Sequence, residues 1–252
     1  MADLRDNGRT FMIEIFSGDG HLTIICVQGG HLCGQPLDIR YSIDLKDVAA
    51  LMQLIEWVAR YEPWLVTIAI PCTAYSRLNK YLNAYLWRRF EAQQKAEYVW
   101  LELTRDLACI QATGGRLVLV ENPNESDAWK KRPLEELQRD PRFVKVTLDQ
   151  CMVNLRDISW PHSLFRKATG LLVMRNTSME NIGVRCSREH EHSWIIGGKR
   201  AKAAGAWTPE FAESIMSNAL QEAVRQYVRL RSWLMLSRSH GEIVDQQTLC
   251  EV

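Results

Sequence analysis

Apolar residues gather along this chain in short continuous runs that stop at polar or glycine-containing turns. The first run covers residues 11–16 and ends at Ser17-Gly18-Asp19-Gly20. Runs of this length are typical of strands buried on both faces of a parallel sheet, and a glycine turn is a common way for such a strand to end. The same pattern predicts further strands over residues 65–70, 116–120, 143–148 and 170–174.

Between these runs, apolar positions recur at the spacing of a helix. This spacing predicts helices over residues 21–28, from 44 or 47 to 62, and over 84–111, 133–139 and 208–236. The last begins at Thr208-Pro209-Glu210, a capping residue followed by proline and an acid in the first turn. Residues 34–43 suit one or two short extended pieces, and 150–169 and 176–207 suit loops and inserted structure.

Strands that alternate with helices predict an α/β fold with a doubly wound, mostly parallel sheet. We expect a single domain over residues 1–236. Its core would be residues 11–123, followed by inserted loops over 150–207 and a C-terminal helix over 208–236. Residues 237–252 are polar, and we expect them to form a mobile tail.

Charge and cysteine content indicate which partners and which cellular compartment to expect. The formal net charge of the 252-residue chain is +1, so a nucleic-acid partner would need a local basic patch. No apolar run is long enough to span a membrane, and the N-terminus lacks a secretory signal. The seven cysteines are irregularly spaced and form no disulfide framework. We therefore expect an intracellular protein, in cytoplasm or nucleus, with reduced thiols and no membrane partner.

Ligands of parallel α/β sheets bind beyond the carboxyl ends of the strands. Four strand ends of this chain carry polar or reactive residues: Ser17 to Gly20, Asp38, Pro71-Cys72 and Glu121-Asn122. The glycine turn would let a ligand approach the backbone at the start of the next helix. An ordinary strand-to-helix turn accounts for these glycines equally well.

Cys72 follows a buried strand, between Pro71 and the stretch Thr-Ala-Tyr-Ser. This placement holds the thiol on a rigid turn, as a nucleophile requires. The alternative is a buried structural cysteine, the commonest kind of free cysteine. Glu121 directly follows another buried strand, where a lone carboxylate is costly to bury. It could bind a pyrimidine edge and supply a proton, or be an exposed loop acid or a helix cap.

The blocks IEIFSGDG, Asp38, Asp44, IPCTAYS and VENP occur in this order. In this order they resemble the conserved blocks of cytosine-5 methyltransferases, over residues 11–123. The chain is also similar to methyltransferase-like segments in polyproteins of some eukaryotic mobile elements. These segments share a Pro-Cys-Thr-x-x-Ser block and a later Cys-x-x-x-His-x-His stretch.

The resemblance implies a Rossmann-like fold that binds S-adenosyl-L-methionine (SAM) and transfers its methyl group to C5 of cytosine in DNA or RNA, with DNA favoured. The Cys72 thiolate would add to C6 of the base, while Glu121 binds the ring nitrogen and Asn122 orders the site. The base would have to be flipped out of a duplex or presented in a single strand. The residues implied to bind SAM are Phe16, Ser17, Gly18, Gly20, Asp38, Asp44 and Pro71.

Departures from the family pattern keep two other functions open. Thr73 stands where the family usually has glutamine, and Asp38 and Asp44 are close together. The family's arginine-rich block is not evident: Arg156 is a candidate for it, but the usual spacing is absent. A catalytically diverged module of the same fold could bind nucleic acid or a nucleotide, for example in a mobile element. A related enzyme could use Cys72 on a pyrimidine with another one-carbon donor.

Two further patterns concern metal and nucleic acid. Cys186-x3-His190-x-His192, with Cys151 as a fourth ligand, could form a structural zinc site; the alternative is a solvated loop beside a core cysteine.

Trp87-Arg88-Arg89 and Trp129-Lys130-Lys131-Arg132 pair aromatic rings with cations, which suits nucleic-acid binding. Solvated helix faces would show the same pairing.

Overall fold

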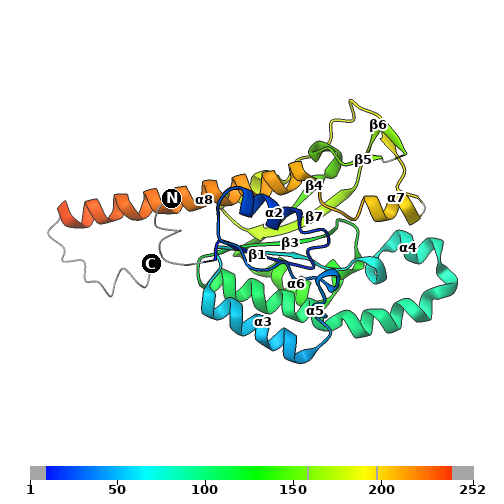
Figure 1. Cartoon of the computed structure of the whole chain (residues 1–252), viewed down its shortest axis with the longest axis horizontal. Helices are drawn as coiled ribbons and strands as arrows, with labels where there is room; N and C mark the ends of the chain where they lie inside the picture. Colours follow the sequence, from blue (N-terminus) through cyan, green and yellow to red (C-terminus); the bar gives the residue numbers. More distant parts are fainter. Residues whose placement is uncertain (1–9, 158, 197, 240–252) are drawn as a thin grey trace.

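A five-stranded sheet forms the centre of the protein (Figure 1). The structure is a computed structural model that describes residues 10–157, 159–196 and 198–239. In spatial order, the strands are β1 (Met12–Ile15), β2 (Leu65–Ala69), β3 (Leu117–Pro123), β7 (Ala168–Met174) and β4 (Phe143–Asp149). The predicted strands are thus present, with β1 and β2 slightly shorter and β3 and β7 longer than expected.

The direction of the strands decides which residues meet at the functional edge. β1, β2 and β3 pair in parallel, whereas β7 is antiparallel to both β3 and β4. Four of the five strands therefore share one direction, which confirms a mainly parallel sheet. Because β7 runs the opposite way, its beginning lies at the edge where β1, β2 and β3 end.

Helices cover both faces of the sheet because every central strand is apolar on both sides. In β3, Val118 and Val120 belong to the core under α3 (Val48–Tyr61), α5 (Trp87–Thr113) and α6 (Arg132–Arg139). Leu117 and Leu119 point the other way, into the core under α2 (His21–Gln28) and α8 (Pro209–Ser239). Figure 1 shows the two helical layers on opposite sides of the sheet.

The helix expected over residues 84–111 was placed too early and taken as a single element. It begins only at Trp87, after a short helix α4 (Arg77–Leu82) and the 3₁₀ turn η3 (Ala84–Leu86). These pieces and the first turns of α5 extend past the sheet at the side where α7 also lies (Figure 1). Apolar periodicity alone did not reveal this break, because no glycine or proline marks it.

The region expected to be loops contains a second, three-stranded sheet. β5 (Arg156–Asp157), β6 (Trp160–Phe165) and β8 (His192–Ser193) form it, and α7 (Gly198–Ala203) follows. Among the residues that the structure describes here, the apolar cluster has Leu155, Phe165 and Ala204 as buried members, with Ile195 packed against them. So small a core gives little stability of its own, and this insertion depends on other contacts to stay ordered. The remaining 3₁₀ turns are η1 (Ile39–Tyr41), η2 (Thr73–Tyr75), η4 (Asp127–Lys130), η5 (Gln150–Val153) and η6 (Ser178–Ile182).

The predicted helix starts are present. Asp47, rather than Asp44, caps α3 by accepting a bond from the Ala49 amide, and Thr208 Oγ1 accepts the Phe211 amide at the start of α8. Within residues 34–43, Leu37 forms an isolated bridge to Ile15 of β1, and Ile39–Tyr41 form the turn η1; a second bridge joins Cys33 to Met12. α8 continues to Ser239, three residues into the expected tail. Residues 240–252 lie outside the described residues, so the rest of the mobile tail stays a prediction, as does the division into one domain. In the described part of the chain, no helix combines the length and apolar character needed to cross a bilayer.

Glu14 lies inside β1 and is 2% exposed. Its Oε2 accepts hydrogen bonds from the Thr23 amide (3.0 Å) and the Thr23 hydroxyl (2.8 Å). Burial nevertheless raises the pKa of Glu14 from 4.5 to about 7. The folded protein therefore keeps a proton that the unfolded chain has already released between these two pH values, so Glu14 lowers stability as the pH rises through this window.

We predict that Glu14→Gln removes this pH dependence. Between about pH 4.5 and pH 8, the free energy of unfolding of the wild type should fall by about 3 kcal/mol relative to the variant. Chemical denaturation of both proteins across this range measures the difference. Stability curves that stay parallel would show that Glu14 does not titrate between the folded and unfolded states.

Candidate active site at the sheet edge

The turn after β1 contains three residues in the left-handed backbone conformation, at the edge of the sheet where β1 ends. Phe16, Gly18 and Gly20 all have positive φ, of 56°, 56° and 68°. Phe16 tolerates this strained conformation because its amide donates to the Leu37 carbonyl (2.7 Å) and its ring packs on Trp100, with ring centroids 5.1 Å apart. A Cβ at Gly20 would lie 2.9 Å from the Tyr41 hydroxyl oxygen, so that position requires glycine.

Asp38 holds this turn in place. Its Oδ2 accepts a bond from the Gly18 amide (3.0 Å), and its Oδ1 accepts one from the Arg40 amide (2.9 Å). Asp38 thus lies at the sheet edge beside the glycine turn, as predicted from sequence. Asp44 does not join it: the side chain is exposed, and Oδ1 accepts a bond from the Lys46 amide (3.0 Å).

The turn forms one wall of a cavity of about 730 Å³. This volume is within the usual range for sites that bind small molecules or cofactors. The strand ends contribute Phe16, Ser17, Gly18, Asp19, His21, Ala69, Cys72 and Thr73, and the other walls are Arg40, Lys199, Ala201, Lys202, Ala203, Gly205, Ala206 and Trp207. Ser17 Oγ is buried and has no hydrogen-bond partner in the described part of the chain, so a polar group remains to be satisfied here.

The part of the wall formed by α7 was not predicted from sequence. His21 Nδ1 lies 2.5 Å from the Trp207 carbonyl oxygen, which ties the start of α2 to the segment before α8. Arg200 of α7 forms an ion pair with the buried Asp157 (2.9 Å). The insertion thereby positions Lys199 and Lys202 over the cavity. No periodic pattern predicts this arrangement, because the segment contains few regularly spaced apolar residues.

Cys72 begins the turn η2 at the end of β2. The Tyr75 amide donates to its carbonyl oxygen (3.0 Å), and Gln94 of α5 donates to the Ala74 carbonyl (2.8 Å). The Cys72 side chain is half-buried and lines the cavity. Burial raises the pKa of the Cys72 thiol above its usual range; the Lys167 ammonium opposes this, and the Glu121 carboxylate adds to it.

Glu121 lies within β3 and not after its end, which corrects the expected strand boundary. It pairs with Ala69 of β2 on one side and with Leu171 of β7 on the other. The side chain is 6% exposed, so it is neither an exposed loop acid nor a helix cap. Its Oε1 lies 3.5 Å from the Lys167 Nζ, and this cation compensates the buried charge.

Lys167 is the site residue that sequence reasoning missed. It immediately precedes β7, so it reaches the edge of the sheet only because β7 is antiparallel. The apolar run at 170–174 predicted the strand but not its direction. No sequence signal distinguishes the two directions here.

Asn122 links β3 to the cysteine turn. Its Nδ2 donates to the Ile70 carbonyl (2.8 Å), directly before Pro71. Asn122 is fully buried, and its Oδ1 has no partner among the described residues. Pro71, Glu121 and Asn122 do not line the cavity themselves; they lie behind or beside Cys72.

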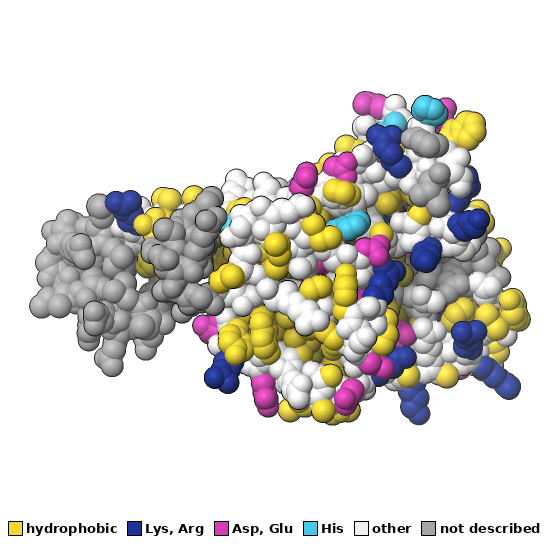
Figure 2. Space-filling view, in the orientation of Figure 1, with side chains coloured by type: hydrophobic (Ala, Val, Ile, Leu, Met, Phe, Trp, Pro, Cys, Tyr) yellow, Lys and Arg dark blue, Asp and Glu magenta, His cyan; other side chains and the backbone are white. Residues whose placement is uncertain are grey.

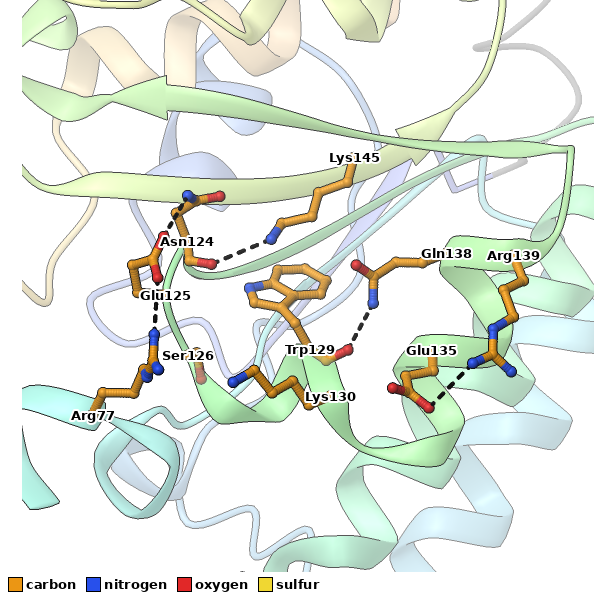
Figure 3. Close-up of a pocket in the computed structure, with 10 residues that line it drawn as sticks. All are labelled: Arg77, Asn124, Glu125, Ser126, Trp129, Lys130, Glu135, Gln138, Arg139 and Lys145. Atoms are coloured by element: carbon orange, nitrogen blue, oxygen red, sulfur yellow. Dashed lines mark hydrogen bonds and ion pairs between the residues drawn. The ribbon is translucent and has the colours of Figure 1, made fainter.

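A second cavity, of about 390 Å³, lies between the end of β3 and α6 (Figure 3). Trp129 forms part of its lining but is 5% exposed; its Nε1 donates to the Pro123 carbonyl (2.9 Å), and Lys145 Nζ lies 4.5 Å from the ring centroid. Trp129 is therefore a core residue that cannot stack on a nucleic-acid base, nor is it part of a solvated face. Arg77 and Arg139 are paired with Glu125 and Glu135.

The four proposed metal ligands come together although Cys151 is far from the others in sequence. The ligand atoms of Cys151, Cys186, His190 and His192 all lie within 4.8 Å of one another. Cys186 Sγ is 3.6 Å from Nε2 of both histidines. Tetrahedral zinc, with bonds of about 2.3 Å to sulfur and about 2.0–2.1 Å to nitrogen, separates such atoms by about 3.6 Å. The cluster can therefore hold a metal ion.

No protein-family model matches the chain, and no curated protein matches it. Among solved structures, the Entamoeba histolytica methyltransferase EhMeth is similar over 73% of this chain, with 13% sequence identity and a TM-score of 0.40. The match covers 57% of that chain, so the described protein corresponds to little more than half of its length. Any assignment of function therefore rests on the residues of the site itself.

The electrostatics of Cys72 predict how its reactivity depends on pH. Because the pKa of the thiol is raised, alkylation of Cys72 by iodoacetamide should be slow near neutral pH and increase through alkaline pH. Lys167→Met should shift this increase to still higher pH, since Lys167 favours the thiolate. Lys145→Met, which changes a half-buried lysine elsewhere, should leave it in place.

Site-resolved mass spectrometry of the labelled protein gives the alkylation rate of each cysteine separately. A midpoint for Cys72 well below that of a free cysteine, about 8.5, would contradict the predicted electrostatics. An unchanged midpoint in Lys167→Met would exclude the proposed action of this lysine on the thiol.

Proposed function

We propose that the protein is a SAM-dependent methyltransferase that modifies C5 of a pyrimidine, cytosine, in nucleic acid. One observation carries the proposal: Cys72 lines a cofactor-sized cavity while the buried Glu121–Lys167 pair acts electrostatically on its thiol. A nucleophile, an acid and a cation are the groups that such chemistry needs in one place.

The residues around the cavity fit SAM. The glycine turn offers close backbone approach, the buried Ser17 hydroxyl lacks a partner, and the volume suits a ligand of this size. Phe16, Ser17 and Gly18 would contact the ligand, while Gly20 and Asp38 would hold the turn. Asp44 and Pro71, which do not line the cavity, would act less directly. When bound, SAM supplies an electrophilic methyl group.

The chain's own residues would perform the remaining chemistry. The Cys72 thiolate adds to C6 of the pyrimidine, and the electron pair of the C5–C6 double bond moves towards C5. Glu121 binds the polar edge of the ring, and Lys167 compensates its charge. Once C5 is methylated, loss of its proton restores the double bond and expels the Cys72 thiolate. Asn122 keeps the cysteine turn in register with β3 through the Ile70 carbonyl.

A catalytically diverged, nucleic-acid-binding module of the same fold is the second candidate. The raised pKa of the Cys72 thiol favours it, because a mostly protonated thiol is a weak nucleophile at neutral pH. The presence of the buried Glu121 carboxylate with Lys167 as its cation favours the methyltransferase over the diverged module. A scaffold alone gains little from such a pair, which apolar residues could replace.

Oligonucleotides that contain 5-fluorocytosine separate the two functions. The fluorine cannot leave as a proton does, so the enzyme should remain covalently attached in a reaction that requires both SAM and Cys72. Denaturing electrophoresis and mass spectrometry detect the adduct. Cys72→Ala should abolish it, whereas Cys109→Ala, which changes another half-buried cysteine, should not. Absence of an adduct with diverse DNA and RNA, together with absence of SAM binding, would overturn the enzymatic proposal in favour of the diverged module.

The Cys/His cluster supports a structural zinc ion in the insertion. Two sulfur and two nitrogen ligands are a common donor set for structural zinc, and all four coordination positions would be filled by protein. The backbone amide of Cys186 donates to the buried Asp149 (3.0 Å), which orients this ligand from outside. Because the insertion has a very small core, a metal ion would supply the stability that apolar burial does not.

Elemental analysis of the purified protein should therefore find zinc in equimolar amount. Cys186→Ser should lose the metal and lower the melting temperature, whereas Cys109→Ser should keep the metal. Limited proteolysis of the metal-free protein should cleave within residues 150–166 or 184–207 before it cleaves the five-stranded sheet and its helices. A wild-type protein that is folded and contains no metal would exclude the site.

A further inference from the structure

The segment over residues 77–95, here called the aromatic arm, exposes large aromatic side chains. Tyr81 is 82% exposed, Tyr85 80% and Trp87 54%. Exposed apolar side chains that gather in one segment are typical of interaction surfaces, whereas scattered ones are ordinary. Among the arm's described side chains, the exposed large apolar ones are all aromatic.

The aromatic arm is also the local basic patch that the nearly neutral chain would need to attract nucleic acid. Its sequence contains five cations and one acid: Arg77, Lys80, Arg88, Arg89 and Lys95 against Glu91. Arg77 and Lys80 are paired with Glu125 and Asp127, which hold α4 against the body of the protein. Arg88 and Arg89 are exposed, and the Arg88 guanidinium lies 5.4 Å from the centroid of the Trp87 ring.

Hydrogen bonds connect the arm to the turn that carries Cys72. Gln94 donates to the Ala74 carbonyl (2.8 Å), and the Tyr75 hydroxyl donates to the Gln94 carbonyl (3.2 Å). Both bonds tie the arm to η2, the turn that Cys72 begins. Figure 1 shows the arm extending from the sheet edge, and Figure 2 shows hydrophobic and cationic side chains gathered at that end of the molecule. A polymer bound along the arm would thus be led to the cavity.

We propose that the aromatic arm binds single-stranded nucleic acid, with unpaired bases stacked on Tyr81, Tyr85 and Trp87 and phosphates contacted by Arg88 and Arg89. Aromatic platforms between cations suit single strands because every unpaired base offers a flat face, whereas duplex bases are already stacked. The aromatic rings of the arm suit the flat faces of the bases, and its positive charge suits the negative phosphates. The proposal deepens the proposed function by naming its substrate as single-stranded, yet binding itself requires neither SAM nor Cys72.

Fluorescence anisotropy of labelled single-stranded DNA and RNA tests the arm in the full chain. Alanine at Tyr81, Tyr85 or Trp87 should weaken binding by about tenfold each, as expected for loss of one stacked base. Tyr61→Ala and Tyr227→Ala are matched controls, because these tyrosines are 45% and 56% exposed on α3 and α8. They should change the affinity less than about twofold.

The salt dependence of the binding affinity is a second measurement. It would not change if Arg88 and Arg89 had only a structural role. On single strands, each phosphate contact contributes about 0.7 to the slope of log K against log salt concentration. Arg88→Ala and Arg89→Ala should each lower this slope by about that amount, while circular dichroism stays unchanged. Tryptophan fluorescence should be quenched by single strands in the wild type, and less so in Trp87→Ala.

The outcomes separate this proposal from the methyltransferase proposal. If the strand binds through the arm but no 5-fluorocytosine adduct forms, the arm stands and the enzymatic function fails. If the adduct forms and arm variants bind single strands normally, the enzymatic function stands and the arm proposal fails. Binding of duplex as tight as single strand would overturn it, as would association with anionic vesicles or self-association that the same arm substitutions abolish.

Discussion

A buried ion pair between Glu121 and Lys167 is the constraint around which the functional edge is organised. Glu121 is 6% exposed in the middle of the sheet, and the half-buried Lys167 compensates the charge of its carboxylate. Lys167 directly precedes β7, and it reaches this edge because β7 runs antiparallel between β3 and β4. The direction of this one strand therefore brings the cation to Glu121.

The cysteine turn depends on the same edge for its position. Asn122, the neighbour of Glu121, bonds to the Ile70 carbonyl just before the Pro-Cys turn, and Gln94 bonds to the Ala74 carbonyl just after it. Cys72 is thus fixed between β3 and α5. The charges nearby act on its thiol in opposite directions, and burial tips the balance towards the protonated form. Hydrogen bonds thus hold the cysteine turn on both sides, and the reactivity of Cys72 depends on the fraction of its thiol that is ionised.

The insertion extends this organisation to the far wall of the cavity. It has almost no apolar core of its own, yet its α7 carries two lysines onto the cavity, and the Asp157–Arg200 pair holds α7 in place. The Cys/His cluster brings Cys151 of η5 close to Cys186 and His190 of the loop before β8, and to His192 of β8.

Residues that lie close together in sequence predicted the alternation of buried strands and amphipathic helices, the glycine turn, and the Pro-Cys turn at the sheet edge. They also predicted Asp38 at that edge and the Cys186, His190 and His192 stretch. Long-range packing set the direction of β7, the role of Lys167, the burial of Trp129, the cavity wall from α7 and the approach of Cys151 to the histidines. Each of these depends on contacts between residues far apart in sequence, and local periodicity holds no information about which strands or charges will meet.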